Sequence, residues 1–311
     1  MIHVACNIDD RYTKYCCVML TSLLHNNADC DFHIHIITQH LGEESRRRLT
    51  DLVETRYGKT LSFYSPHADS VKHFHVKENS HITIATYFRV FIASLLPADI
   101  DKVLYLDCDL VVDGPVTELW NTDISDVTLA GVEDMWSGRP EIYERLGYPQ
   151  RYSYFNAGVL LLNLAKIRKS DFEQHALRNL IEHPEKYEMN DQDLLNELLH
   201  DDKKFLPFRW NVQDGFLRHR RYERMSAESL PGLCDELRNP VIVHYTGGHK
   251  PWQYKSIHPM KGRYYHYLDM TEWARERPTV PASFRIKLAV DRALQALRLA
   301  RPKYLKHPTR L

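Results

Sequence analysis

Apolar and polar positions repeat with two different periods over the first 65 residues. Residues 2–9, 32–38 and 60–65 show the short, apolar, partly alternating pattern of strands. Residues 13–27 and 43–58 carry apolar side chains at helical spacing and end in Asn-Asn and in glycine, which stop helices. The order strand, helix, strand, helix, strand predicts right-handed crossovers and a mainly parallel sheet.

The rest of the chain continues this alternation, apart from a charged, irregular stretch at residues 204–238. The pattern predicts a helix at 82–97, a strand that starts at 102, strands at 128–134 and 154–164, helices at 166–183 and 189–199, and a strand at 240–244. We therefore expect one α/β domain over residues 1–280 with a mainly parallel central sheet. Residues 281–311 are expected to form a separate tail.

Two carboxylates follow the apolar run that starts at residue 102. Asp107 and Asp109 are two positions apart, so in an extended chain their side chains point the same way and Cys108 points away. The carboxyl end of a strand is where α/β sheets place ligands. Two like charges this close repel unless a partner neutralises them. The pair indicates either a divalent cation site or two solvated carboxylates in a turn.

Two predicted helices carry polar residues with alternative interpretations. Arg89 stands in an apolar segment, where it either reaches the surface along its aliphatic stem or meets an anionic ligand. Asn190 or Asp191 can cap a helix that begins near Gln192. Capping does not require Asp191, Gln192 and Asp193 together.

Two glycine-containing segments indicate close approach of the backbone to another group. Gly158 lies within the apolar run at 154–164, just after Asn156. His244 ends a short strand and is followed by Gly247, Gly248 and Lys250. A lone histidine at a strand end is most simply structural. With two glycines and a lysine beside it, the segment indicates a loop that approaches an anion.

Composition places the chain among soluble globular enzymes, with 26% charged and 43% apolar residues among 311. It has no GxGxxG or GxxxxGK[ST] motif, no apolar run of membrane-spanning length and no signal-peptide pattern at its start. The six cysteines form no CxxC pair, which predicts reduced, mostly buried thiols. We therefore expect a cytoplasmic protein.

Charge is unevenly distributed, although the net charge is zero. Residues 275–311 contain ten Lys/Arg and two acidic residues, a net charge of +8 that the preceding residues balance. In this tail Ile286, Val290, Leu294 and Leu297 form an apolar helical stripe surrounded by basic residues. The stripe either packs on the body or lies on an anionic membrane surface. No nucleic-acid-binding motif accompanies the charge, so we expect no nucleic acid partner.

Four segments, taken in order, resemble one family of enzymes. KVLYLDCDLVV is followed by FNAGVLLLNL, NDQDLLN and HYTGGHKPW. This order resembles the family 8 retaining glycosyltransferases, and among them the bacterial α-1,4-galactosyltransferases of lipooligosaccharide synthesis. The resemblance runs from Val4 to Trp252. It implies a nucleotide-binding, GT-A type fold, a UDP-hexose donor and a divalent cation, Mn²⁺ or Mg²⁺.

The resemblance also implies a role for each matching residue. Asp107, Asp109 and His244 would hold the metal, with Cys108 between the aspartates. The other positions are Asn7, Asp9 and Tyr12 for uridine; Gly247 and Lys250 for the diphosphate; Arg89, Asp134, Asn156, Asp191 and Gln192 around the sugar; and His81 and Thr86, which match family positions nearby. Ile8 departs from the small residue that the family often has there, and Cys108 is a variable position.

Retention of configuration leaves two mechanisms open. Gln192 is an amide and a poor nucleophile, so a covalent intermediate would more readily use Asp191. We favour front-face substitution, in which the donor phosphate accepts the proton of the acceptor. Lys250 and the metal would stabilise the leaving diphosphate.

The expected function is transfer of galactose or glucose from a UDP-sugar to a glycan or glycolipid acceptor of a bacterial surface polysaccharide. The tail would then lie at the inner face of the cytoplasmic membrane. The alternatives are a UDP-sugar-binding protein without activity and a metal-dependent phosphohydrolase. Residues 66–81 and 204–238 are expected to be acceptor-binding or lid segments.

Overall fold

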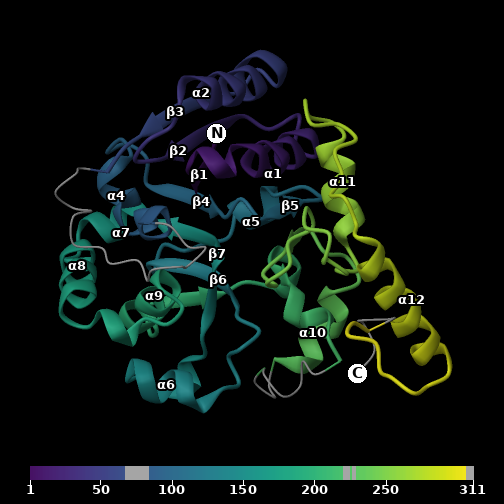
Figure 1. The fold of residues 1–311 in the computed structure, drawn as a ribbon. Coiled ribbons are helices and arrows are strands. Elements are labelled where there is room, and N and C mark those ends of the chain that lie inside the picture. Colours follow the sequence, from purple (N-terminus) through teal and green to yellow (C-terminus); the bar gives the residue numbers. More distant parts are fainter. Residues whose placement is uncertain (67–83, 220–224, 226–228, 306–311) are drawn as a thin grey trace.

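The computed structural model describes residues 1–66, 84–219, 225 and 229–305. Its centre is a sheet of seven strands that crosses the body (Figure 1). In spatial order the strands are β3 (Thr60–Tyr64), β2 (Phe32–Ile37), β1 (Ile2–Asn7), β4 (Lys102–Leu106), β7 (Phe155–Asn163), β6 (Leu129–Glu133) and β8 (Lys203–Phe205). The expected α/β class is confirmed.

Four of the six strand pairs in this sheet are parallel. β3, β2, β1 and β4 run the same way, as the alternating N-terminal pattern predicts. β7 is antiparallel to both of its neighbours, β4 and β6, whereas β8 is parallel to β6. The expected mainly parallel sheet is therefore confirmed, and it contains one reversed strand.

A second, smaller sheet lies beside the carboxyl end of β4. It contains β5 (Leu110–Val112), β10 (Ile242–His244) and β9 (Val212–Gln213), in that order. β5 pairs antiparallel with β10, and β10 pairs parallel with β9. The apolar run that starts at residue 102 therefore passes from one sheet to the other, and the two aspartates occupy the crossing.

Helices lie on both faces of the large sheet, and the C-terminal helix stands apart from it. The described helices are α1 (Thr13–His25), α2 (Glu43–Thr50), α4 (Ile92–Leu95), α5 (Thr117–Trp120), α6 (Pro140–Leu146), α7 (Leu164–Arg168), α8 (Phe172–Glu182), α9 (Asp191–Leu199), α10 (Leu230–Glu236), α11 (Lys261–Leu268) and α12 (Ala282–Ala296). Short 3₁₀ segments span Asp10–Tyr12, Ile84–Phe91, Gln150–Tyr152, Pro184–Lys186, Phe208–Trp210 and Asp214–Leu217.

Several predicted elements differ in detail from the structure. The helix expected at 43–58 is α2 followed by a π-helical turn, Asp51–Arg56, and the chain then turns at Gly58 with φ +62°. The helix expected at 82–97 is 3₁₀ over Ile84–Phe91 before the single α-helical turn of α4. The stretch at 204–238 contains β9, α10 and two 3₁₀ segments, so the expectation of irregular structure there was wrong.

Alternation along the strands divides the core into two layers. Ile2, Val4 and Cys6 face α1 and its buried side chains, whereas Ala5 and Val103 face the layer that holds α8 and α9. Figure 1 shows α1 and α2 on one side of the sheet and α8 and α9 on the other. Burying apolar side chains on both faces stabilises a sheet of this kind and fixes the register of its strands.

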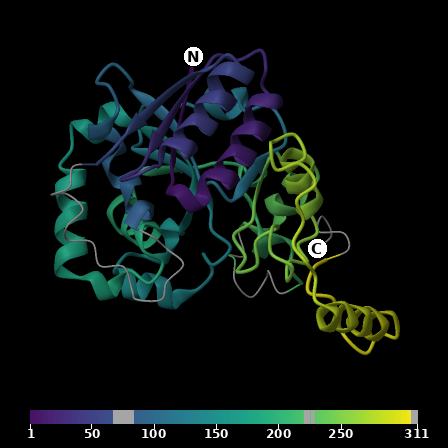
Figure 2. The same cartoon turned by 45° about the horizontal axis from the view of Figure 1, so that its top comes forward.

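The C-terminal helix α12 stands away from the rest of the chain (Figure 2). No residue of α12 is buried, and Ile286 and Val290 are 65% and 51% exposed. The alternative in which the stripe packs on the body is therefore wrong for these two residues. After α12 the chain returns to the body, where Tyr304 forms an antiparallel bridge with Arg218. Among the described residues no helix combines the length and the apolar character needed to cross a membrane.

Candidate active site

The crossing between the two sheets brings three metal-ligating side chains together. Asp107 follows β4, Asp109 precedes β5, and His244 ends β10 opposite Leu110. His244 Nε2 lies 3.0 Å from Asp109 Oδ1 and 3.8 Å from Asp107 Oδ2. The ligand atoms of these three residues lie within 4.8 Å of one another. The predicted convergence of the two aspartates is therefore present in the structure.

Positive groups balance the two carboxylates from opposite sides. Asp107 Oδ1 accepts hydrogen bonds from Arg89 Nη2 at 3.0 Å and from the Tyr105 hydroxyl at 2.8 Å. Asp109 Oδ2 accepts one from Lys250 Nζ at 2.6 Å. Burial disfavours the Asp109 anion, but the charges of Lys250 and His244 outweigh burial and lower the pKa of Asp109. The pair is not simply solvated in a turn.

Two features show that the residues fit a divalent cation. His244 Nδ1 lies 3.0 Å from Asn211 Oδ1, a carbonyl oxygen that accepts the Nδ1 proton, and this hydrogen bond turns Nε2 toward the two aspartates. A Cβ built on Gly158 would lie 2.1 Å from His244 Cε1 and 2.8 Å from Asp107 Oδ2. The backbone at Gly158 is thus as close to the ligands as the sequence predicts. Two carboxylates and one imidazole suit Mn²⁺ or Mg²⁺.

A buried network of amides and hydroxyls lies beside this centre. Gln192 Oε1 accepts hydrogen bonds from Asn156 Nδ2 at 3.1 Å and from the Ala157 N–H at 3.0 Å. Gln192 Nε2 donates to Asp134 Oδ2 at 3.2 Å and to the Tyr154 hydroxyl at 3.1 Å. Asn156 also donates to Asp134, and burial raises the pKa of Asp134. The structure therefore brings Asp134, Asn156 and Gln192 together.

Arg89 joins the metal-binding side to the helix α9. Its side chain is 6% exposed, so it does not reach the surface, and its Nε lies 2.7 Å from Asp191 Oδ2. Arg89 also donates to the Ala157 carbonyl group. Burial raises the pKa of Asp191 to about 7, although the charge of Arg89 acts in the opposite direction. One buried guanidinium thus contacts both Asp107 and Asp191.

The expected side-chain cap of α9 is wrong. The helix begins at Asp191, and Asn190, with φ +53°, makes no capping hydrogen bond with its side chain. Asn190 Oδ1 instead accepts a hydrogen bond from Tyr87, and Asp193 Oδ2 accepts the N–H of Met189 at 2.7 Å. Asp193 thus holds the backbone just before the helix, and Asp191 and Gln192 contact other parts of the site.

The residues predicted to bind uridine lie where β1 ends. The Asp9 carboxylate accepts the Tyr12 N–H at 3.2 Å, and burial raises the pKa of Tyr12 to about 12. The Cys108 thiol points toward the Asn7 carbonyl at 3.8 Å, away from the aspartates. Ile8 is buried in the core, 2% exposed. These residues therefore adjoin the aspartate crossing on its β1 side.

The other predicted residues differ in how far the structure describes them. Gly247 lines a cavity of about 710 Å³ together with Tyr154, Trp136, Arg145 and Arg218. Thr86 lies in the 3₁₀ segment Ile84–Phe91. His81 lies outside the described residues.

Comparison with known proteins identifies the family of the chain. The model of glycosyl transferase family 8 matches residues 3–256, most of the chain. The chain belongs to glycosyl transferase family 8. The resemblance of the four motifs is therefore confirmed, and the protein is a glycosyltransferase.

Individual relatives of this family 8 chain cover nearly all of it. General stress protein A of Bacillus subtilis is 30% identical over 280 residues, which are 88% of this chain and 95% of that protein. Lipopolysaccharide 1,2-glucosyltransferase of Escherichia coli K12 is 27% identical over 286 residues, covering 89% and 80%. The crystal structure of galactosyltransferase LgtC with donor and acceptor sugar analogues matches with a TM-score of 0.78 and 26% identity, over 92% of this chain and 100% of that chain.

Three residues of the site in this family 8 chain were not predicted from the sequence. Asn211 positions His244 and also donates to Asn156 at 2.8 Å. Tyr154 contacts Gln192, and its hydroxyl donates to Asp193 at 2.7 Å. Asp214 is 2% exposed and lies against Gly247, where a Cβ would be 3.0 Å from Asp214 Cγ. Asn211 and Asp214 stand in the stretch that was expected to be irregular, so no periodic pattern marked them.

Gly158→Ala is expected to displace the metal ligands, because the new methyl group would overlap His244. We expect Mn²⁺ affinity to fall by more than about tenfold and unfolding free energy to fall by about 1–3 kcal/mol. Calorimetric Mn²⁺ titration and urea unfolding measure the two effects. Gly262→Ala is the matched control, since nothing lies within 4 Å of a Cβ there. Unchanged Mn²⁺ affinity in Gly158→Ala would show that the ligands are not this close.

Asp191 makes the stability of the metal-free enzyme depend on pH. Its folded-state pKa of about 7 lies above the unfolded value, so the stability it contributes is complete below about pH 4 and is lost as pH rises to 7. Asp191→Asn removes this loss. We expect the variant to gain on the order of 2–3 kcal/mol relative to the parent between about pH 5 and pH 8.

Urea unfolding in chelator at several pH values tests this expectation. The control is Asp126→Asn, at an exposed aspartate in the loop before β6. A stability difference between Asp191→Asn and the parent that stays constant from pH 5 to pH 8 would contradict the raised pKa.

Proposed function

We propose that this chain transfers a hexose, galactose or glucose, from a UDP-sugar to a glycan or glycolipid acceptor with retention of configuration. The observation that carries the proposal is the Asp107–Asp109–His244 cluster with Lys250 and the Gln192 network beside it. Relatives named as lipopolysaccharide glucosyltransferase and galactosyltransferase support a role in bacterial surface glycan synthesis. The neighbour LgtC, solved with donor and acceptor analogues, supports a nucleotide-sugar donor.

In this proposal the uridine, the diphosphate and the sugar of the donor each contact a different part of the site. Asn7, Asp9 and Tyr12 bind uridine at the end of β1. Asp107, Asp109 and His244 would hold Mn²⁺ or Mg²⁺, which supplies positive charge to the diphosphate when bound. Lys250, whose Nζ lies 2.6 Å from Asp109, is long enough to turn toward the same anion with Gly247 beside it. Arg89, Asp134, Asn156, Asp191 and Gln192 surround the sugar.

The hydrogen bonds favour front-face substitution over a covalent intermediate. Gln192 Oε1 already accepts two N–H groups and its Nε2 donates twice, so the amide is held in place and its oxygen is engaged. Asp191, the alternative nucleophile, is buried against Arg89, and a carboxylate in an ion pair is a weaker nucleophile. Gln192 is then a positioning group for the sugar, and the donor phosphate accepts the acceptor proton.

The cavity of about 710 Å³ is the proposed acceptor site. It lies between Gly247 of the diphosphate loop and α6, with Trp136 and Tyr154 among its lining residues. Its volume is in the range of small-molecule sites, and its aromatic side chains provide flat apolar surfaces on which sugar rings can stack. Arg218, from the stretch expected to bind the acceptor, also lines it.

Transfer is tested by UDP release from purified protein with Mn²⁺ and, in turn, UDP-galactose, UDP-glucose and their N-acetyl analogues. We expect metal-dependent release from one donor. Asp109→Ala should lose at least about a hundredfold in rate because it removes a ligand for the cation that stabilises the leaving group. Asp126→Ala, which removes an exposed carboxylate, should keep the parent rate. Release of inorganic phosphate would support the phosphohydrolase alternative, and tight UDP binding without release would support the binding protein.

We also propose that residues 1–280 form the catalytic body and that residues 281–311 bring it to the inner face of the cytoplasmic membrane. Ile286 and Val290 are exposed on α12, and Arg285, Lys287 and Arg292 stand beside them in sequence. A helix with exposed apolar side chains and flanking positive charges suits an anionic lipid surface.

Vesicle sedimentation tests the membrane proposal. The parent should bind vesicles containing phosphatidylglycerol and not pure phosphatidylcholine. The double variant Ile286→Ser/Val290→Ser should reduce binding by at least about threefold, since it removes buried apolar area in the lipid, and should leave transfer to a soluble acceptor unchanged. Ile181→Ser, at a 50% exposed position on α8, is the control. Equal binding by the double variant and the parent would refute the proposal.

A further inference from the structure

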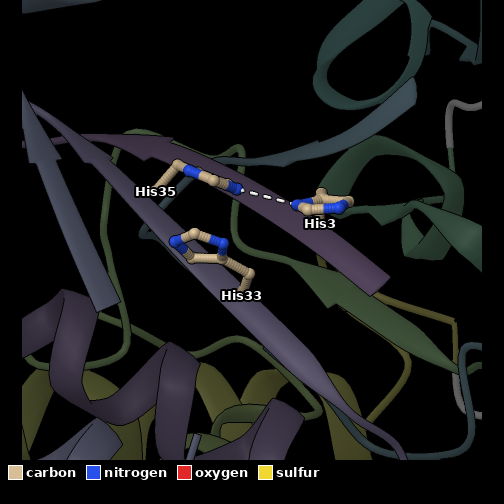
Figure 3. Close-up of side chains that lie close together, drawn as sticks. All are labelled: His3, His33 and His35. Atoms are coloured by element: carbon tan, nitrogen blue, oxygen red, sulfur yellow. Dashed lines mark hydrogen bonds between the residues drawn. The ribbon is translucent and has the colours of Figure 1, made fainter. Parts of the chain in front are cut away.

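Three imidazoles gather on the large sheet, outside the site described above (Figure 3). His3 lies on β1, and His33 and His35 lie on β2. The register pairs His3 with His33 and Ala5 with His35, which places all three on the face turned away from α1. Two neighbouring strands thus present three nitrogen ligands from a rigid backbone.

The nitrogen atoms are close enough to share one ion. One ring nitrogen from each of the three residues lies within 4.8 Å of the others, and His3 Nδ1 is 3.0 Å from His35 Nε2. With Zn–N bonds of about 2.0–2.1 Å, two ligands of a tetrahedral zinc lie about 3.3 Å apart. The His3–His35 separation differs little from this value, and rotation about the broad χ2 torsion can bring the His33 nitrogen, which lies within 4.8 Å, closer to the other two.

Second partners hold two of the rings at their other nitrogen. The Tyr64 hydroxyl lies 3.1 Å from His35 Nδ1, and Ser62 Oγ lies 2.9 Å from His33 Nε2. Both partners come from β3, the next strand. A hydrogen bond at the second nitrogen fixes the orientation of the ring, as is usual for metal ligands. His35 Nε2 and His33 Nδ1 therefore remain as ligand atoms beside His3.

The imidazoles are in the protonation state that binds metals. Burial lowers the pKa of His3, His33 and His35, and the charges of the neighbouring histidines lower it further for His3 and His35. Each ring is thus neutral near pH 7 and carries a free lone pair. His35 is fully buried, whereas His3 and His33 are half-buried, so an ion can reach the cluster from their side.

We propose that His3, His33 and His35 form a second cation site, for a borderline transition ion such as Zn²⁺ or Ni²⁺. Three imidazoles with no carboxylate ligand select such ions, whereas the two carboxylates of the Asp107–Asp109–His244 cluster suit Mn²⁺ or Mg²⁺. Water occupies the fourth position, on the half-buried side. The bound ion joins β1 to β2 and raises the resistance of these strands to unfolding.

Calorimetric titration with Zn²⁺ tests the site, with untagged protein and in the Asp109→Ala background, which removes a ligand of the Asp107–Asp109–His244 cluster. We expect one Zn²⁺ per chain. His33→Gln and, separately, His3→Gln should each weaken binding by at least about tenfold, because each removes one ligand. His183→Gln, at an exposed histidine elsewhere, should bind as the Asp109→Ala parent does.

Two further measurements make the outcome decisive. Zn²⁺ should raise the thermal midpoint of Asp109→Ala and not that of Asp109→Ala/His33→Gln, whose metal-free midpoint shows that it folds. Co²⁺ bound to the Asp109→Ala protein should give the intense visible bands of a tetrahedral nitrogen site, and these bands should disappear with His33→Gln. Equal Zn²⁺ affinity with and without His33, or the absence of any Zn²⁺ binding, would overturn the proposal and leave a hydrogen-bonded histidine cluster.

Discussion

Repulsion between two carboxylates at a sheet crossing is the constraint on which the rest of the site depends. Asp107 and Asp109 are held by the ends of β4 and β5, so they cannot move apart without breaking two sheets. The negative charges of the two aspartates are balanced by groups from distant parts of the chain. Arg89 comes from the 3₁₀ segment, His244 from the end of β10, and Lys250 from the loop after β10. Because these groups all contact the two aspartates, their ion pairs hold the large and the small sheet together.

Much of the fold was predictable because the hydrophobic pattern of this chain is clear where both faces of a strand are buried. The N-terminal alternation located three strands and two helices nearly to their observed ends, and the Asp-Cys-Asp spacing and Gly158 pointed to the place where Asp107, Asp109 and His244 come together. Helical periodicity does not separate a 3₁₀ segment from an α-helix over Ile84–Phe91, since repeats of 3.0 and 3.6 residues per turn are hard to tell apart in so short a run. Asn211 could not be predicted from the sequence. Its role comes from a hydrogen bond to His244, which is 33 positions away, and the local sequence pattern does not indicate such a contact.

The strand β1 runs between the histidine cluster and the Asp107–Asp109–His244 cluster. His3 lies near its start and Asn7 at its end, and between them Val4 and Cys6 are fully buried against α1. The strand therefore carries an imidazole of the histidine cluster near one end and, at the other end, a residue beside the aspartate crossing. The alternating pattern predicted the strand β2 but did not predict the cluster of its two histidines with His3. Alternation alone does not distinguish a solvent-facing side chain from a half-buried one that contacts its neighbours.

The return of the chain after α12 gives this helix two mechanical attachments to the body. One is the segment that enters α12, and the other is the bridge between Tyr304 and Arg218. The Tyr304 hydroxyl donates to Asp214, and the Asp214 carboxyl group lies against Gly247. The helix is therefore anchored to the body at two points, and the second of them reaches Gly247 through Tyr304 and Asp214.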